Sequence, residues 1–450
     1  MNFSYILLSL IFQSIIINII TCKKQSKQKE PEYDLPDYIK WAKYNNISIY
    51  PSLNFTKEDK NLKTYYKLFT SETIPINTTL LKFPLIMILN ITKILDLINI
   101  QELKKQYEEF IDNEIYEDDY SPELKKDEAF LTYILYQIHE GRKKMTKTLF
   151  YKKFKYFINT LKINADFTPL FFEDVTLNKL YLSYINTLYM KNKRNFEHET
   201  YIFKSDSYYK RDIDYDEYLP LRIAIINSGL IINEQKMLIP LLNLIRTDYI
   251  KYNCNYTLDK DGTIIIYSTK EIKANEELIF YSKEMSNAQR LLFEGRTYPE
   301  LNYYFDEYLI PAFGISLYVK FNIEDADLEF NNYINLLEEG YQEDAIYIYK
   351  AHLDILKREN TPEDETGKGW PYEILLNNLK AFKEYIVNFG KDKIYEYVED
   401  KQDRINIERV ILGDKKILVK AYEETEIKAS EYIDLNSRRT DDSDDTNSEL

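Results

Sequence analysis

Cysteine and histidine, the residues of zinc sites and thiol nucleophiles, are scarce in this chain of 450 residues. The sequence has two cysteines, Cys22 and Cys254, so neither a disulfide framework nor a Cys/His zinc site can be built from it. The carboxylates of residues 101–127 follow no ligand spacing and indicate a solvated face. We therefore expect no metal cofactor, and a core position for Cys254. The histidines are far apart in the sequence: His139, His198 and His352.

The clearest pattern of secondary structure lies between residues 263 and 296. An apolar run of strand length at 264–267 is followed by a polar bend at 270–275 and a second apolar run at 278–281. Ser286 and Asn287 then have the residue types of a helix start, with apolar residues behind them. The sequence predicts strand, turn, strand, loop and helix here.

This stretch resembles the end of a SET domain, in the branch typified by the Rubisco large-subunit lysine methyltransferase and the actin-histidine methyltransferase. The residues that carry the resemblance keep the order and spacing of that family. They are Ile272, Asn275 to Leu278, Tyr281, Ser286 to Ala288, Leu291, Leu292 and Glu294 to Arg296. Further matches are Trp41, Leu68, Phe69, Ile74, Pro84, Ala224, Ser228, Leu238 to Pro240, and Leu412 to Leu418. The resemblance spans roughly residues 36–430.

The resemblance implies an α+β fold. Residues 36–300 would form a SET domain of small β-sheets with a knot-like core, interrupted by a helical insert at about 95–220. Residues 301–430 would form an all-α domain of the substrate-binding type, and the helical spacing of apolar residues from about 301 favours this. Residues 431–450 would be a disordered acidic tail.

The same resemblance implies a site for S-adenosylmethionine-dependent methyl transfer to a protein lysine. Tyr281 matches the catalytic tyrosine, whose hydroxyl would orient the amine and stabilise the charge on the transferring methyl group. The cofactor would be met by Tyr65, Lys67, Arg246, Thr247, Ser286 and Asn287. The substrate would be met by Ser228, Glu294 and Arg296.

Several of these positions depart from the family pattern. Tyr65 and Lys67 replace glycines of the cofactor loop, Gly229 replaces an arginine, and Arg246-Thr247 replaces an Asn-His pair. Arg offers only hydrogen-bond donors, so it cannot reproduce an Asn amide. The aromatic residues of the family's Tyr-Gly-Phe are replaced by Glu and Arg, which we expect to form an ion pair that fills an unused pocket. Two functions stay open: a protein-lysine N-methyltransferase, and a catalytically inactive pseudoenzyme that acts as a protein-binding module in the secretory pathway.

Composition limits the partners. A hydrophobic content of 44% excludes a disordered chain. A net charge of −15 argues against nucleic acid as the partner. The resemblance implies a protein substrate or a protein partner. Residues 5–21 are apolar and are followed by Lys23 and Lys24, so residues 1–22 indicate a secretory signal peptide or a signal anchor. The chain would enter the secretory pathway, or be held by a membrane tether on the cytosolic face.

Overall fold

The computed structural model describes most of the chain between residues 35 and 320 and a helix near the C-terminus. The described residues are 35–60, 63–112, 116, 121–161, 168–171, 184–205, 213–281, 285–297, 307–312, 315–320, 401–417, 419, 423 and 426–427. The N-terminal segment 1–22, the helical patterns expected at 328–390 and the acidic tail 431–450 lie outside the described residues. None of the helices in the part described is long and apolar enough to cross a bilayer.

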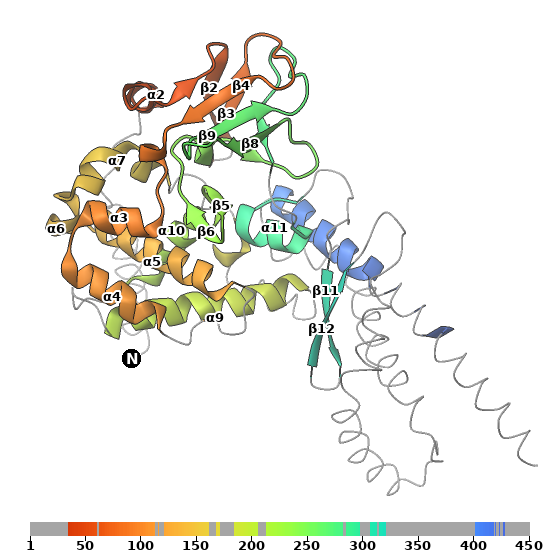
Figure 1. Cartoon of the computed structure of the whole chain (residues 1–450). Coiled ribbons are helices and arrows are strands. Elements are labelled where there is room, and N and C mark those ends of the chain that lie inside the picture. Colours follow the sequence, from red (N-terminus) through yellow and green to blue (C-terminus); the bar gives the residue numbers. More distant parts are fainter. Residues whose placement is uncertain are drawn as a thin grey trace, which may run out of the picture.

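A six-stranded sheet forms the upper layer in Figure 1. Its strand order is β1-β4-β9-β8-β10-β7. Neighbours are antiparallel except β10, which runs parallel to both β7 and β8. The bounds are β1 (Ser48–Ile49), β4 (Thr79–Phe83), β7 (Arg246–Thr247), β8 (Cys254–Leu258), β9 (Ile264–Ser268) and β10 (Ile279–Phe280). The sequence predictions of β9, β10 and a buried Cys254 are confirmed.

Three two-stranded hairpins are separate from this sheet. β2 (Leu53–Lys60) pairs with β3 (Lys63–Thr70), and β5 (Leu230–Ile232) pairs with β6 (Gln235–Met237). The third hairpin, β11 (Glu307–Ala312) with β12 (Ile315–Lys320), corrects the expectation of helix within residues 307–320, whereas the helix at 401–417 agrees with it. Short runs rich in Tyr, Leu, Ile and Val favour strands once they pair, and this preference prevails over the apolar spacing that we interpreted as helical.

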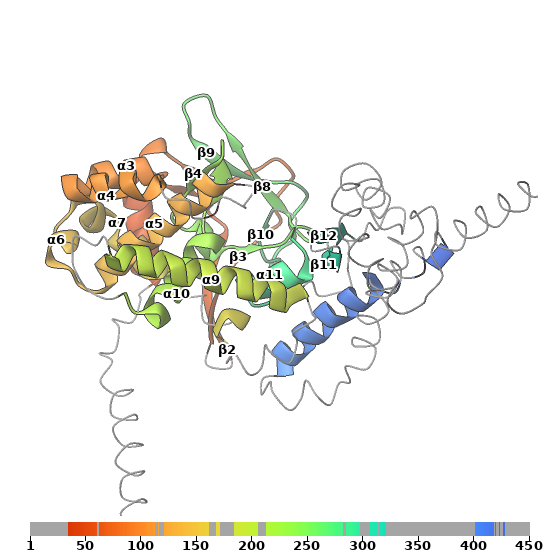
Figure 2. The same cartoon turned by 90° about the horizontal axis from the view of Figure 1, so that it is seen from below.

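The helices form a layer below the sheet, and most of them come from the chain between β4 and β5 (Figures 1 and 2). They are α3 (Ile91–Ile98), α4 (Gln101–Ile111), α5 (Pro122–His139), α6 (Lys143–Thr146), α7 (Leu149–Thr160), α9 (Tyr184–Ser205) and α10 (Tyr215–Asn227). Outside this region lie α2 (Leu35–Tyr44), α11 (Asn287–Glu294) and the helix at 401–417. Short 3-10 turns are η1 (Leu85–Met87), η2 (Pro169–Phe171) and η3 (Leu242–Leu244).

A buried charge network fastens the helical layer together. The Arg222 guanidinium of α10 lies 3.1 Å from a carboxylate oxygen of Glu199 in α9 and 3.2 Å from one of Glu128 in α5. The ammonium of Lys236, in β6, contacts the other oxygen of Glu128 at 3.1 Å. Two cations are thus balanced by two carboxylates, and the network joins three helices to the β5–β6 hairpin.

Candidate functional site

The parallel pairing of β7 with β10 creates the centre of the candidate site. Arg246 lies opposite Ile279 and Thr247 opposite Phe280. The amide of Asp248 donates a hydrogen bond of 2.9 Å to the Phe280 carbonyl, and the amide of Tyr281 donates one of 2.9 Å to the carbonyl of Cys254. The residues that follow β7 therefore lie beside the end of β10.

Tyr281 lies in a cluster of half-buried tyrosines. Its ring centroid is 5.1 Å from that of Tyr252 in an edge-to-face arrangement and 5.6 Å from that of Tyr249 in a tilted one. Such pairs are favourable geometries for aromatic quadrupoles. The negative faces of tyrosine rings also attract ammonium groups. The structure thus surrounds the predicted catalytic tyrosine with two rings that the sequence analysis did not single out.

Helix α11 carries the next part of the site. The Ser286 hydroxyl caps it by accepting from the amide of Gln289, whose side chain accepts from the Ser286 amide in return. Gly295 ends the helix with a φ of +68°, a conformation that glycine adopts without steric cost. Both ends are therefore fixed, and the helix presents Arg290 and Glu294 toward β7.

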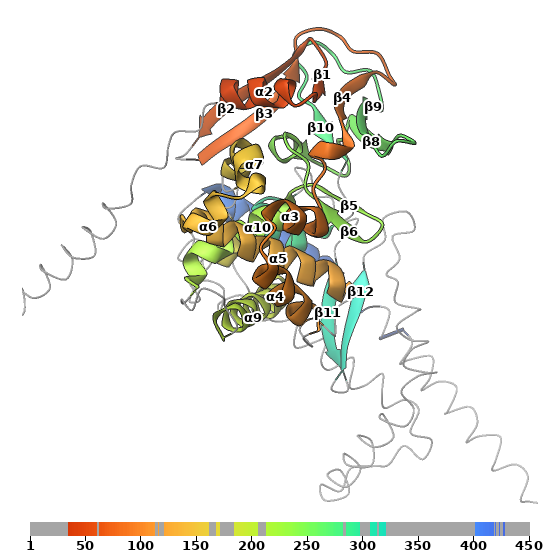
Figure 3. The same ribbon diagram turned by 60° about the vertical axis from the view of Figure 1, so that its left-hand side comes forward.

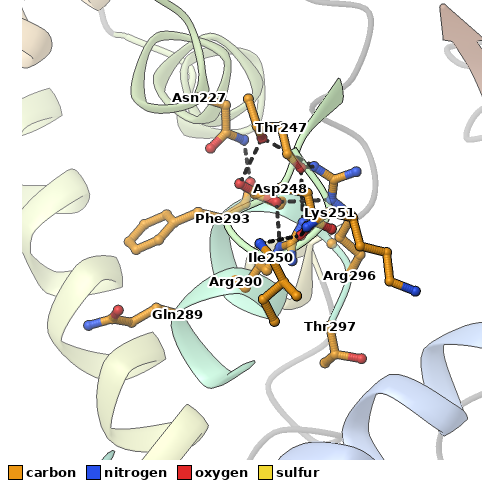
Figure 4. Close-up of polar contacts among 12 residues, drawn as sticks. Asn227, Thr247, Asp248, Ile250, Lys251, Gln289, Arg290, Phe293, Arg296 and Thr297 are labelled. Carbon is orange, nitrogen blue, oxygen red and sulfur yellow. Dashed lines mark hydrogen bonds and ion pairs between the residues drawn. The ribbon is translucent and has the colours of Figure 1, made fainter. Parts of the chain in front are cut away.

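An ionic network joins α11 to β7 (Figure 4). One carboxylate oxygen of Glu294 lies 2.9 Å from Nε of Arg290 and 2.9 Å from Nε of Arg296. Both guanidinium groups also donate to the carbonyl of Thr247, over 3.0 and 2.7 Å. Arg290 contacts the Asp248 carboxylate at 3.4 Å. The predicted ion pair between Glu294 and Arg296 is present, and it belongs to a larger set that we call the α11 network: Thr247, Asp248, Arg290, Glu294 and Arg296.

The α11 network is buried and electrically balanced. The side chains of Arg290 and Asp248 are 2% and 3% exposed, and that of Glu294 is 10% exposed. Burial opposes ionisation of Glu294, but Arg296 and Arg290 outweigh it and lower the pKa of this carboxyl. The pKa of Asp248 is lowered for the same kind of reason, burial being outweighed by Arg290 and two backbone amides. Two carboxylates thus stay ionised opposite two guanidinium groups.

Thr247 uses much of its hydrogen-bonding capacity within the protein, whereas the buried Nε atom of Arg246 has no hydrogen-bond partner among the described residues. The Thr247 hydroxyl lies within hydrogen-bond distance of Glu294 and Arg296, at 3.3 and 3.2 Å, and its carbonyl accepts from two arginines as described above. Arg246 lies 3.6 Å from the carboxylate of Glu277. A third guanidinium is thereby added beside the α11 network.

The other predicted site residues have structural partners or lie in a regular strand. Ser228 is the C-cap of α10, is buried, and donates from its hydroxyl to the carbonyl of Ala224 at 2.5 Å. Tyr65 and Lys67 are in β3, opposite Glu58 and Thr56 in β2, so an extended hairpin stands where the resemblance implied a glycine loop. Asn287 is the first residue of α11 and is buried. The structure therefore brings Thr247, Glu294 and Arg296 into direct contact, with Arg246 and Tyr281 on the paired strands, and leaves Ser228 as a helix cap.

Sequence reasoning missed Asp248, Arg290, Tyr249 and Tyr252. A signal for Arg290 was present, because it precedes Glu294 by four residues and occupies the apolar side of a short helix. No comparable signal marked the two tyrosines in a chain with 42 of them.

Comparison with solved structures identifies the fold. The SET domain of LSMT bound to lysine and AdoHcy is similar with a TM-score of 0.57 at 13% identity, over 88% of this chain and 92% of that chain. The chain has a SET-domain fold. Rubisco LSMT bound to AdoMet gives a TM-score of 0.56 at 15% identity, over 88% of this chain and 92% of that chain. Rubisco LSMT bound to sinefungin and monomethyllysine gives 0.54 at 15%, over 89% and 93%. No family model and no curated protein matches the sequence.

The SET fold implies S-adenosylmethionine, but the residues at the predicted cofactor positions of this SET domain do not fit it. Arg246, Arg290 and Arg296, at and around β7, each contact a carboxylate of the protein, so these side chains are already engaged within the fold. The carbonyl and hydroxyl of Thr247 are already bonded within the α11 network. In the described residues no group of three His, Cys, Asp or Glu side chains is arranged to hold a metal ion.

Proposed function

We propose that this SET-fold protein binds a lysine-bearing segment of another polypeptide and does not transfer a methyl group to it. The α11 network carries the proposal. The SET resemblance assigns several positions to cofactor and pocket residues. In this chain, side chains at these positions bond to one another instead. Separating the charges of a buried, balanced network costs free energy, because each charged side chain would be left without its counter-ion.

The tyrosine cluster supports the binding half of the proposal. Tyr249, Tyr252 and Tyr281 are half-buried, so part of each ring remains accessible. A lysine ammonium placed against such rings gains a cation–π attraction. The same rings can pack against the apolar part of a lysine side chain. Recognition of this kind needs neither a cofactor nor proton transfer.

A protein-lysine methyltransferase is the second candidate, and one observation favours it. Tyr281, which the resemblance matches to the catalytic tyrosine, directly follows β10 and precedes the capped helix α11. A tyrosine there could orient an amine for transfer. Fold alone does not decide between an active and an inactive site.

Calorimetric titration of the full chain with S-adenosylmethionine and S-adenosylhomocysteine distinguishes the two candidates. We expect no heat of binding at millimolar ligand. Binding in the micromolar range would overturn the proposal and favour the methyltransferase.

Binding of lysine is tested separately, with a library of lysine-containing peptides. We expect captured peptides to be lost on the double substitution Tyr249→Ala/Tyr252→Ala and retained on Tyr44→Ala, which removes a tyrosine that is 87% exposed elsewhere. Capture that is indifferent to the double substitution would contradict the assignment of the tyrosine cluster as the binding surface.

A further inference from the structure

One stretch of this acidic protein contains cations and no carboxylate. Between Gly141 and Ala165 the chain has no Asp or Glu, although the net charge of the protein is −15. The described part of this stretch forms α6 and α7. The net charge of the whole chain does not reveal this basic stretch, because acidic residues elsewhere outnumber its cations.

Helix α7 has two distinct faces. Its inner face is apolar and buried, with Phe150, Phe154, Phe157 and Ile158 all at most 1% exposed. Its outer face carries Leu149, which is 59% exposed, followed at helical spacing by Lys152 and Lys155. The apolar face of α7 is thus used by the protein core, and its outer face presents lysines and one exposed leucine to the surroundings.

Helix α6 extends the same charged surface. Lys143, Lys144 and Lys147 are exposed beside the start of α7. We call these three residues with Leu149, Lys152 and Lys155 the α6–α7 face. In the described part of the chain, no carboxylate forms an ion pair with Lys143, Lys147 or Lys152. The α6–α7 face is therefore not neutralised by the protein itself at these positions.

The electrostatic surroundings of α7 are positive as well. Lys93, in the neighbouring helix α3, has a pKa lowered first by burial and then by the charge of Lys153. The nearest acid before the stretch is Glu140, at the end of α5. Anions would therefore be drawn to this region in spite of the negative total charge.

The N-terminal part of the chain enters the fold next to this surface. Trp41, in α2, donates from its indole nitrogen to the carbonyl of Lys153 over 3.0 Å and packs against the rings of Phe154 and Tyr156. Figure 3 shows α2 above α7. Residues 22–34 separate the apolar run 5–21 from α2, and this length of chain reaches at most about 45 Å. A membrane that held the apolar run would thus be within reach of α6 and α7.

We propose that the α6–α7 face binds the anionic lipid headgroups of a membrane surface, with Leu149 entering the headgroup region. The α6–α7 face gathers five exposed lysines from two consecutive helices and the turn between them, and basic clusters of about this size bind anionic leaflets. Lys23 and Lys24, directly after the apolar run, place positive charge on the same side as the folded domain. The face then lies against the cytoplasmic leaflet, where anionic lipids are concentrated. This inference is independent of whether the SET site is active.

Vesicle flotation of the full chain tests the proposal. Vesicles of phosphatidylcholine alone are compared with vesicles that also contain phosphatidylserine. The apolar N-terminal segment contributes to binding of both kinds of vesicle. The partition coefficient for the phosphatidylserine vesicles divided by that for the phosphatidylcholine vesicles therefore isolates the contribution of the α6–α7 face. Each lysine near an anionic surface changes affinity by about fivefold. The variant Lys143→Glu/Lys147→Glu/Lys152→Glu is therefore expected to lower the ratio at least about 100-fold.

A matched variant controls for total charge. Lys260→Glu/Lys270→Glu/Lys273→Glu reverses the same number of exposed lysines on β-turns away from α7 and is expected to leave the ratio unchanged. Leu149→Ser should weaken binding to both kinds of vesicle, whereas Leu258→Ser, at a residue that is 47% exposed, should not. An equal effect of the two triple variants, a ratio near one for the unmodified chain, or preferential capture of duplex DNA over anionic vesicles would overturn the proposal.

Discussion

The Nε atom of Arg296 lies 2.9 Å from Oε2 of Glu294, the same oxygen that Arg290 contacts at 2.9 Å. One carboxylate oxygen thus serves two guanidinium groups, and the carbonyl of Thr247 accepts from both on the other side. This arrangement makes Glu294 the residue on which the α11 network depends, because its removal would leave two like charges close together.

The first prediction concerns Glu294→Ala. It should lower the free energy of unfolding by about 2–4 kcal/mol, because the buried Arg290 and the partly exposed Arg296 lose their shared counter-ion. Urea denaturation measures the change. Glu271→Ala, at an exposed position, should stay within about 0.5 kcal/mol of the unmodified protein. Similar small effects for both variants would mean that the α11 network does not stabilise the fold.

The second prediction concerns pH. The pKa of Glu294 is lower in the folded protein than in the unfolded chain, so its stabilisation is complete above about pH 5 and is lost as the pH falls through the lowered folded pKa. Asp248 shifts in the same direction. Glu294→Gln should therefore flatten the acid side of the stability profile between about pH 5 and pH 3. Chemical denaturation at a series of pH values would show this, and an unchanged slope would contradict it.

The third prediction concerns Gly229, where the SET pattern has an arginine. Its φ is +74°, and an added Cβ would lie 1.9 Å from the carbonyl oxygen of Met237. Gly229→Ala should cost about 3 kcal/mol, because it combines a strained backbone with a clash against backbone atoms. Gly141→Ala is the control, since Gly141 has a similar φ of +68° but nothing within 4 Å of the added atom. It should cost about 1 kcal/mol, and equal losses would refute the steric argument.

The fourth prediction concerns the helix at 401–417. Asn406 accepts a hydrogen bond from the Thr297 hydroxyl at 3.0 Å and donates to the Gly295 carbonyl at 3.4 Å. Asn406→Ala should increase hydrogen exchange at the amides of residues 295–297 by about tenfold, equivalent to about 1.4 kcal/mol of local stability. Asn159→Ala, at an exposed position on α7, is the comparison variant. Exchange that does not differ between the two would mean that the helix does not hold this segment.

The fifth prediction concerns the N-terminus. If the α6–α7 face lies against the cytoplasmic leaflet, residues 1–22 remain attached as an anchor. N-terminal sequencing of the protein from membranes of expressing cells should then begin within the first few residues. A new N-terminus near residue 23 would indicate a cleaved signal peptide and a luminal chain.

The sequence predicted the fold where elements are short-range and strongly patterned. The run of isoleucines in β9, the apolar end of β10 and the Ser286 cap of α11 each contain their own local signal, and all three elements form as predicted. The parallel pairing of β7 with β10 has no such signal. It joins segments that are distant in the sequence, and β7 is only two residues long.

The site was less accessible to sequence reasoning for a related reason. The pairing of Glu294 with Arg296 was anticipated because both replace the aromatic residues of the family's Tyr-Gly-Phe. The contact of Thr247 with two arginines depends on how α11 packs against β7. This packing is a tertiary relationship, so no local sequence pattern indicates it. Arg290 was overlooked because a charged residue on a short helix is ordinarily solvated, whereas here it is buried.

The four charged residues Glu128, Glu199, Arg222 and Lys236 belong to four different elements of the chain, α5, α9, α10 and β6. Because each neutralises its neighbours, a change at one is tolerated only with a compensating change at another. In relatives of this protein, these four positions should covary. Glu128 should be lost only together with Lys236, because Lys236 would otherwise lose the carboxylate that it contacts at 3.1 Å beneath the β5–β6 hairpin.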